Sequence, residues 1–248
     1  MTSLNGDVAW DDFNPREYNR RNYLFRHPDD EEILSLVRDH FSDHFRKSSG
    51  RVGSGIDVGA GPNLYPALAM LPWCDRITLL ERSLGNVRYL GEQRDSYDGM
   101  WDKFWDVLCK EEAYRALGVD PRVRFREAVD VRKGDIFDLG GGAERWDLGT
   151  MFFVAESITE SLDQFRLGVA SFMTALKPGA PFAAAFMENS KGYYVDGRKF
   201  PATSIGKRGV SSALKGYADG ANIYRLGTPD DLREGYTGMI VACGRRNG

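Results

Sequence analysis

The chain has 248 residues, of which 42% are hydrophobic and 28% are charged, and its formal net charge at pH 7 is −3. This length suits one α/β domain with a substantial core, and the composition excludes a disordered or membrane-embedded chain. The slightly acidic balance offers no general basic surface for nucleic acid. Residues 1–10 lack the basic start and apolar centre of a signal peptide, and no apolar run approaches the ~20 residues that a membrane span needs.

The cysteines and histidines give no sign of a metal or a disulfide. The three cysteines are far apart, and their spacing matches neither a disulfide framework nor a metal site. His40 and His44 are spaced i, i+4 like a zinc pair, but the glutamate of an H-E-x-x-H motif and a third ligand are missing. We therefore expect a cytoplasmic protein without a metal and, by default, a monomer.

Hydrophobic patterning along the chain predicts alternating helices and strands after a polar, aromatic N-terminal arm. Asp29 and Asp30 are suited to the first turn of the first long helix. We predict helices at about 30–45, 64–71, 85–94, 101–117 and 162–176, and strands at about 54–58, 77–80, 123–132, 147–154, 181–187, 222–226 and 239–243. Asp196-Gly197 predicts a hairpin over 193–200.

Two glycines after the first predicted strand form the most informative stretch of the chain, Asp57-Val58-Gly59-Ala60-Gly61. A strand that turns into a helix on Gly-x-Gly lets a ligand lie against bare backbone, because no Cβ stands in the way. Leu64 replaces the third glycine of the dinucleotide motif, and Asp57 would repel a pyrophosphate. We therefore expect S-adenosylmethionine, with its sulfonium and amino acid groups over this turn.

Acidic residues follow the next two predicted strands. Glu81 ends the strand at 77–80, where a carboxylate can accept two hydrogen bonds from a ribose diol. Asp135 follows the third strand, where it could accept a hydrogen bond from the adenine amino group. The alternatives are a solvated strand-end acid at Glu81 and a turn aspartate at Asp135.

Several motifs occur together in one order along the chain. They are Phe13-Asn14-Pro15-Arg16-Glu17-Tyr18 followed by Asn22-Tyr23, Asp57-Val58-Gly59-Ala60-Gly61-Pro62 with Tyr65, Glu81 with Asn86, Gly134-Asp135-Ile136, Leu176-Lys177-Pro178-Gly179 and Tyr193-Tyr194. In this combination the chain resembles the family of nicotinamide, phenylethanolamine and indolethylamine (thioether) N-methyltransferases over about residues 12–245. The Gly-x-Gly-Pro run with the upstream Asn-Pro-x-x-Tyr is specific, whereas Lys-Pro-Gly occurs across methyltransferases generally.

The resemblance implies a class I methyltransferase fold: a Rossmann-like, three-layer αβα sandwich with a seven-stranded, mostly parallel sheet and a helical N-terminal lid. It implies a single domain, residues 1–248, with the arm and lid helix at 1–47 and the core at 52–248, including a hairpin insertion at 190–204. The cofactor would be S-adenosylmethionine and the product S-adenosylhomocysteine. The cofactor-binding residues implied are Tyr18, Tyr23, Asp57, Gly59, Ala60, Gly61, Tyr65, Glu81, Arg82, Asn86, Asp135, Ile136 and Phe152.

The two arm tyrosines in that set, Tyr18 and Tyr23, would close over the methionine part of the cofactor and over the acceptor. Aromatic residues in a terminal arm can alternatively serve only to pin the arm to the core. The acceptor-binding residues implied by the resemblance are Phe153, Met187 and Tyr193. Candidates for orienting the acceptor are Tyr18, Glu156, Glu188 and Lys191.

The acceptor pocket departs from the family pattern at two positions. Met187 stands where the nicotinamide enzyme has an aspartate that binds the carboxamide, and the nearest acid is Glu188. Lys191 falls where relatives carry a serine or a substrate-binding glutamate. A lysine there would favour an anionic or carbonyl-bearing acceptor, unless its side chain extends into solvent.

The chemistry expected of this site is modest. Methyl transfer from a sulfonium is an in-line displacement with an activated leaving group, so positioning and exclusion of water can supply most of the acceleration. A general base matters only if the acceptor arrives protonated or is a hydroxyl. We expect transfer to a nitrogen of a small molecule. The alternatives are O-, S- or C-methylation of a specialised metabolite on the same fold, an NAD-dependent oxidoreductase and a non-catalytic protein that binds S-adenosylmethionine.

Overall fold

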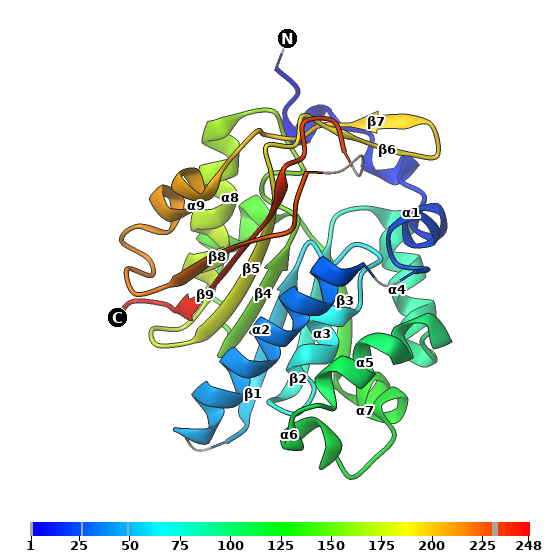
Figure 1. Ribbon diagram of the computed structural model, residues 1–248, viewed down its shortest axis with the longest axis vertical. Helices are drawn as coiled ribbons and strands as arrows, with labels where there is room; N and C mark the ends of the chain where they lie inside the picture. The colour runs from blue at the N-terminus through cyan, green and yellow to red at the C-terminus, as the bar shows by residue number, and fades with distance from the viewer. Residues whose placement is uncertain (1, 26, 49, 230–232) are drawn as a thin grey trace.

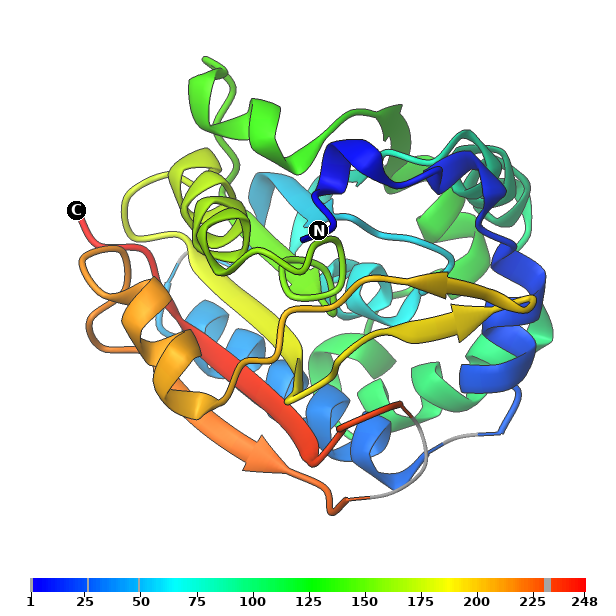
Figure 2. The same cartoon turned by 90° about the horizontal axis from the view of Figure 1, so that it is seen from above.

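One seven-stranded sheet with helices on both faces organises the chain (Figures 1 and 2). The computed structural model describes residues 2–25, 27–48, 50–229 and 233–248. The strands of this sheet are β1 (Val52–Val58), β2 (Cys74–Glu81), β3 (Val129–Lys133), β4 (Leu148–Phe152), β5 (Pro181–Glu188), β8 (Asn222–Leu226) and β9 (Gly238–Arg245). Their order is β3-β2-β1-β4-β5-β9-β8. Neighbours from β3 to β5 pair in parallel, whereas β9 is antiparallel to both β5 and β8. The predicted α/β fold is confirmed.

The helices are α1 (Pro15–Asn22), α2 (Pro28–Arg46), α3 (Tyr65–Met70), α4 (Leu84–Asp95), α5 (Asp102–Leu108), α6 (Glu112–Arg115), α7 (Pro121–Ala128), α8 (Leu162–Ala175) and α9 (Lys207–Leu214). Local sequence explains where several of them begin. Pro28 occupies the first turn of α2, after His27, whose side chain accepts a hydrogen bond from the Asp29 N–H. The side chains of Ser83 and Ser161 cap α4 and α8 in the same way. No helix in the described ranges is both long and apolar enough to cross a membrane.

Alternate side chains of β5 point to opposite faces of the sheet. Ala183 and Ala185 join the apolar cluster that contains α2, α3 and α5, and Ala184 and Phe186 join the cluster that contains α8 and α9. Every residue of β5 is buried. A strand covered on both faces reads as a continuous apolar run, which is the pattern that predicted it.

Three sequence predictions differ from the structure. Residues 121–128 form α7 instead of part of a strand, so β3 is confined to 129–133. The Asp120 side chain accepts a hydrogen bond from the Arg122 N–H and Pro121 occupies the first turn, so this helix start overrides the alternating pattern that follows. The stretch 101–117 is interrupted between α5 and α6. Helix α9 was not predicted.

The N-terminal arm and a two-stranded hairpin cover the carboxyl end of the parallel strands. The arm contains two 3-10 turns, Asn5–Asp7 and Trp10–Asp12, followed by α1. The hairpin consists of β6 (Tyr193–Val195) and β7 (Arg198–Phe200), and both residues of its turn have positive φ, as Asp-Gly predicted. Viewed from above, the two segments lie next to each other (Figure 2), and Phe13 packs with Tyr193 and Phe200.

Candidate active site

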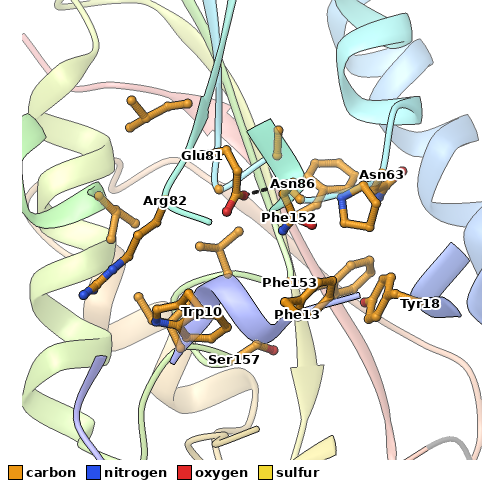
Figure 3. Close-up of a pocket in the computed structure, with 18 of the residues that line it drawn as sticks. Trp10, Phe13, Tyr18, Asn63, Glu81, Arg82, Asn86, Phe152, Phe153 and Ser157 are labelled. Carbon is orange, nitrogen blue, oxygen red and sulfur yellow. Dashed lines mark hydrogen bonds between the residues drawn. The ribbon is translucent and has the colours of Figure 1, made fainter. Parts of the chain in front are cut away.

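A cavity lies between this cover and the carboxyl ends of β1 to β4 (Figure 3). Its empty volume, part of which is open to solvent, is about 780 Å³. The strand order reverses direction between β1 and β4, and this is the place where doubly wound sheets bind ligands. The predicted site residues that line the cavity are Tyr18, Tyr23, Gly59, Ala60, Gly61, Glu81, Arg82, Asn86, Asp135, Ile136, Phe152, Phe153 and Tyr193.

The glycine turn after β1 forms part of the cavity wall. Gly59 and Gly61 have φ values of 63° and 54°, which favour glycine. A Cβ built on Gly59 would lie only 2.5 Å from Cγ1 of Val154. The sequence therefore needs glycine here both for backbone conformation and for space, and the turn presents bare backbone to the cavity.

The carboxylate of Glu81 is anchored at the end of β2. Its Oε2 accepts a hydrogen bond from the Gly61 N–H at 2.8 Å, and its Oε1 accepts one from the Ser83 N–H at 2.7 Å. Burial raises the pKa of Glu81, and these two backbone donors oppose that rise. Glu81 is therefore a buried, positioned carboxylate and not a solvated strand-end acid. Each oxygen has a second lone pair for a ligand hydroxyl.

Asp135 has two roles in the structure. Its carboxylate caps the 3-10 helix Ile136–Gly141 by accepting a hydrogen bond from the Phe137 N–H at 3.0 Å. It also accepts hydrogen bonds from Arg82 Nη1 at 2.7 Å and from Asn5 Nδ2 at 3.1 Å. Asn5 belongs to the arm, so the arm reaches the part of the cavity expected to hold the adenine.

Two asparagines of the cavity carry buried polar atoms that have no hydrogen-bond partner among the described residues, Nδ2 of Asn63 and Oδ1 of Asn86. One is a donor and the other an acceptor, so a ligand with both kinds of group would satisfy them. S-adenosylmethionine carries hydroxyl, amino and carboxylate groups, and the bare glycine turn leaves room for it. The residues present therefore fit this cofactor.

Asp57 and Tyr65 lie outside the cavity lining, which differs from their expected contact with the cofactor. Oδ1 of Asp57 accepts a hydrogen bond from Thr150 Oγ1 at 2.7 Å, and its buried Oδ2 has no hydrogen-bond partner in the part of the chain that the structure describes. Burial raises the pKa of Asp57 to about 8. The Tyr65 hydroxyl donates to Asp30 Oδ1 at 3.1 Å, so this side chain ties α3 to α2.

Tyr18 and Tyr23 line the cavity in different ways. Tyr23 is almost fully buried and packs against Tyr65, Trp101 and Phe104, so it pins the arm to the core. Tyr18 is only half-buried, and its ring contacts Phe13 and Tyr193. Its hydroxyl is therefore the more available to a ligand.

Four residues expected at the acceptor lie outside the cavity lining: Glu156, Met187, Glu188 and Lys191. The Lys191 side chain is exposed. Glu188 Oε2 accepts hydrogen bonds from Arg225 Nε and Thr237 Oγ1, both at 2.7 Å. This carboxylate at the end of β5 therefore ties down Arg225 of the edge strand β8. The structure places these four residues outside the cavity lining, so direct contact with the acceptor stays a prediction for them.

Glu156 is buried directly behind the cavity wall. Its Oε1 accepts hydrogen bonds from the Met187 N–H at 2.9 Å and from the hydroxyl of Ser157 at 3.1 Å, and Ser157 does line the cavity. Burial raises the pKa of Glu156 to about 7. Glu156 is therefore linked to the cavity lining through the Ser157 hydroxyl.

The cavity lining also contains residues that were not assigned to the site from the sequence: Asn5, Trp10, Phe13, Pro62, Asn63, Leu80, Gly134, Ser157, Ile158 and Arg233. Pro62, Asn63 and Gly134 adjoin recognised motifs, and Phe13 opens the arm motif, so proximity could have indicated them. Arg233 has no such signal. Phe153 adopts a φ of 60°, a strained conformation for a non-glycine residue that turns its ring to the cavity.

His40 of α2 is half-buried against the sheet, next to β9. Nε2 of His40 lies 3.1 Å from the Gly244 carbonyl oxygen, and burial lowers the pKa of this imidazole to about 4. Within the described ranges, no group of three or more His, Cys, Asp or Glu side chains is placed to hold a metal ion.

Comparison with known proteins gives a family and a fold. A family model described as the NNMT/PNMT/TEMT family matches residues 2–229. The N-methyltransferase NodS from Bradyrhizobium japonicum, solved with S-adenosylhomocysteine, is 14% identical with a TM-score of 0.55, covering 95% of this chain and 100% of NodS.

Two further structures share the fold at similarly low identity. The 1,6-didemethyltoxoflavin-N1-methyltransferase from Burkholderia thailandensis is 13% identical with a TM-score of 0.55, covering 94% of this chain and 84% of its own. An S-adenosylmethionine-dependent methyltransferase from Clostridium acetobutylicum is 13% identical with a TM-score of 0.51, and the match covers 86% of this chain and 91% of that protein. At this identity the three likenesses establish the fold alone.

Proposed function

Because the chain belongs to the NNMT/PNMT/TEMT family of S-adenosylmethionine-dependent methyltransferases, we propose that it methylates a nitrogen atom of a small-molecule acceptor in the cavity beneath the arm and hairpin. The observation that carries this proposal is that one covered cavity contains both the bare glycine turn and the anchored carboxylate of Glu81. The turn can accommodate the methionine part of the cofactor, and the carboxylate can accept hydrogen bonds from the ribose.

The cofactor contacts follow from the chemistry of the lining. Asp135 and Ile136 flank the adenine, with Arg82 and Asn5 holding the Asp135 carboxylate. The unpartnered atoms of Asn63 and Asn86 give hydrogen bonds to the polar groups of the ligand. Tyr18 covers the methionine part next to the acceptor.

The bound cofactor supplies a methyl group that is already activated by the sulfonium. The protein then has to orient the acceptor lone pair and to exclude water. Aromatic side chains of the arm and the hairpin do both, since they form the cover of the cavity; these are Trp10, Phe13, Tyr18 and Tyr193. Glu156 positions Ser157 at the wall beneath them.

We infer further that the protein works in the cytoplasm as a monomer. Its three cysteines are unpaired thiols, and two of them, Cys74 and Cys243, are buried in the core. Thiols of this kind are typical of a reducing compartment.

Transfer of a labelled methyl group from S-adenosylmethionine tests the proposal, with a panel of amines, pyridines, phenols and thiols as acceptors. Methylated amines or pyridines would support it, whereas products from phenols or thiols alone would move the reaction to oxygen or sulfur. Calorimetric titration with S-adenosylhomocysteine and with NAD accompanies the assay. Binding of NAD instead would overturn the proposal.

A further inference from the structure

The guanidinium of Arg233 is buried in the wall of the cavity. Arg233 is 7% exposed, and its Cζ lies 4.3 Å from the centroid of the Tyr193 ring. Its Nη1 donates a hydrogen bond to Ser157 Oγ at 3.0 Å, and its Nη2 donates one to the Tyr18 hydroxyl at 3.3 Å. All three neighbours line the same cavity. Arg233 is therefore held in one orientation by an aromatic ring and two hydroxyl groups.

No carboxylate of the described residues forms an ion pair with this guanidinium, whereas Glu188 pairs with Arg225 and Asp135 pairs with Arg82. Glu156 is the acid that approaches it, and the Ser157 hydroxyl lies between them. Within the described part of the chain this buried cation faces no anion directly, which is costly, and a guanidinium has more N–H donors than the two used here. An anion entering the cavity would satisfy both the charge and the remaining donors.

The position of Arg233 indicates which ligand brings that anion. Tyr193 belongs to the hairpin and Ser157 follows β4, the segments expected at the acceptor. Figure 3 shows Ser157 set apart from Glu81, the carboxylate proposed to bind the ribose. Because Arg233 contacts Ser157 and Tyr193, we place its guanidinium at the acceptor end of the cavity.

We propose that Arg233 binds a carboxylate of the methyl acceptor, so that the substrate is an amine or nitrogen heterocycle that also carries an acid group. The planar guanidinium matches a carboxylate through two parallel hydrogen bonds, and stacking on Tyr193 keeps its plane fixed. This inference rests on the proposed function and names its substrate class. It also replaces the anionic preference first assigned to Lys191, which is exposed.

The test uses two probes that differ only in the acid group, 3-aminobenzoate and 3-aminobenzamide, titrated by calorimetry into the complex with S-adenosylhomocysteine at constant ionic strength. We expect the acid to bind at least about tenfold more tightly than the amide. Arg233→Gln removes that preference and leaves the affinity for S-adenosylhomocysteine unchanged. Equal binding of the two probes, or binding of neither, overturns the inference.

The methionine part of the cofactor also carries a carboxylate. The same titrations show whether Arg233 binds that carboxylate or the carboxylate of the acceptor. If Arg233→Gln lowers the affinity for S-adenosylhomocysteine about tenfold and does not change the preference for 3-aminobenzoate over 3-aminobenzamide, Arg233 binds the cofactor and the inference fails. Arg233→Lys keeps the positive charge but lacks the planar guanidinium, so it should retain only part of the preference for 3-aminobenzoate over 3-aminobenzamide.

The control variant is Arg166→Gln, because Arg166 lies on α8 with a side chain that is 55% exposed. It should leave both titrations as in the wild-type protein, and circular dichroism shows whether each variant is folded. Methylation of uncharged amines without an acid preference would overturn the role of Arg233 and leave the proposed function standing. Failure to bind S-adenosylhomocysteine would overturn both.

Discussion

The indole ring of Trp10 stacks on the phenyl ring of Phe200, with ring centroids 5.5 Å apart and planes inclined by 25°. Trp10 belongs to the N-terminal arm and Phe200 to the hairpin, so residues 190 positions apart in the sequence close one cover. The contact between Asp12 and Arg198 and the hydrogen bond from Asn14 to Asp196 tie the same two segments together. These polar contacts are exposed, and the aromatic stack is therefore expected to dominate closure.

Trp10→Ala is expected to raise the KM for S-adenosylmethionine several-fold and to lower kcat. An aromatic pair is worth about 0.5–1.5 kcal/mol, so its loss shifts the cover toward an open state that admits water. Steady-state kinetics measure both constants. Phe25→Ala is the matched control, since this arm residue is 83% exposed, and its kinetics should be unchanged. Identical kinetics for both variants would show that closure of the cover does not limit the reaction.

Glu81→Ala is expected to weaken binding of S-adenosylhomocysteine by about 1–3 kcal/mol, as for the loss of a charged hydrogen-bond partner. The variant loses the carboxylate proposed to bind the ribose and also releases the Gly61 N–H. Calorimetry measures the affinity, and Glu144→Ala, at an exposed ion pair with Arg132, provides the comparison. An unchanged affinity would remove Glu81 from the binding site.

Gly59→Ala is expected to destabilise the protein by about 1–3 kcal/mol and to weaken cofactor binding, because the new Cβ meets Val154 at a positive φ. Adding Val154→Ala should recover the steric part of the loss. Gly91→Ala, in α4 with no neighbouring atom within 4 Å of the new Cβ, should instead stabilise the protein by about 0.5–1 kcal/mol. Urea unfolding measures all three, and equal behaviour at positions 59 and 91 would contradict this account of the turn.

Because of Asp57, the free energy of unfolding is expected to fall as the pH rises toward 8. Burial raises its pKa from 3.8 to about 8 in the folded protein, so between these values the folded state binds more protons than the unfolded state. The free energy of unfolding contributed by Asp57 therefore falls as the pH rises, and it is lost once the pH passes the folded pKa. The amide of Asp57→Asn does not titrate, so this variant should lose less stability than the wild type between about pH 7 and pH 8.5.

The same experiment has an internal control. His40 also titrates with a shifted pKa, but its folded value is about 4, so it changes little in this window. Asp163→Asn, at a side chain that is 92% exposed, should follow the wild-type curve. If the free energy of unfolding falls equally with pH for the wild type and Asp57→Asn, Asp57 is ionised over this whole pH range and the prediction is wrong.

The nucleoside half of the site was predictable, and the acceptor half was not. Gly59, Glu81 and Asp135 each follow a predicted strand, and parallel strands bring their carboxyl ends to one edge, so their proximity follows from sequence order. Arg233 reaches the cavity from a loop before β9 and meets Tyr18, which lies 215 positions away. No periodicity or spacing encodes such a contact, and an arginine among acidic residues reads as a solvated one.

Helix α7 shows the same limit for secondary structure. Alternation of arginines with Val123 and Phe125 predicted a strand, but Asp120-Pro121 was a competing helix start. In the folded chain Phe125 is buried against Tyr97, and Arg122 stacks on that tyrosine at 4.5 Å. The capped helix start and the packing of Phe125 against Tyr97 together outweigh the alternating pattern.

The position of β9 has a consequence for how the chain folds during synthesis. This strand is the last of the sheet in sequence, yet it lies between β5 and β8 and is hydrogen-bonded to both. While the ribosome is still making residues 238–245, one edge of β5 is therefore unpaired, and β8 has no partner in the sheet. An unpaired apolar edge is prone to aggregation. The edge of β5 is therefore protected only after β9 has been synthesised and inserted.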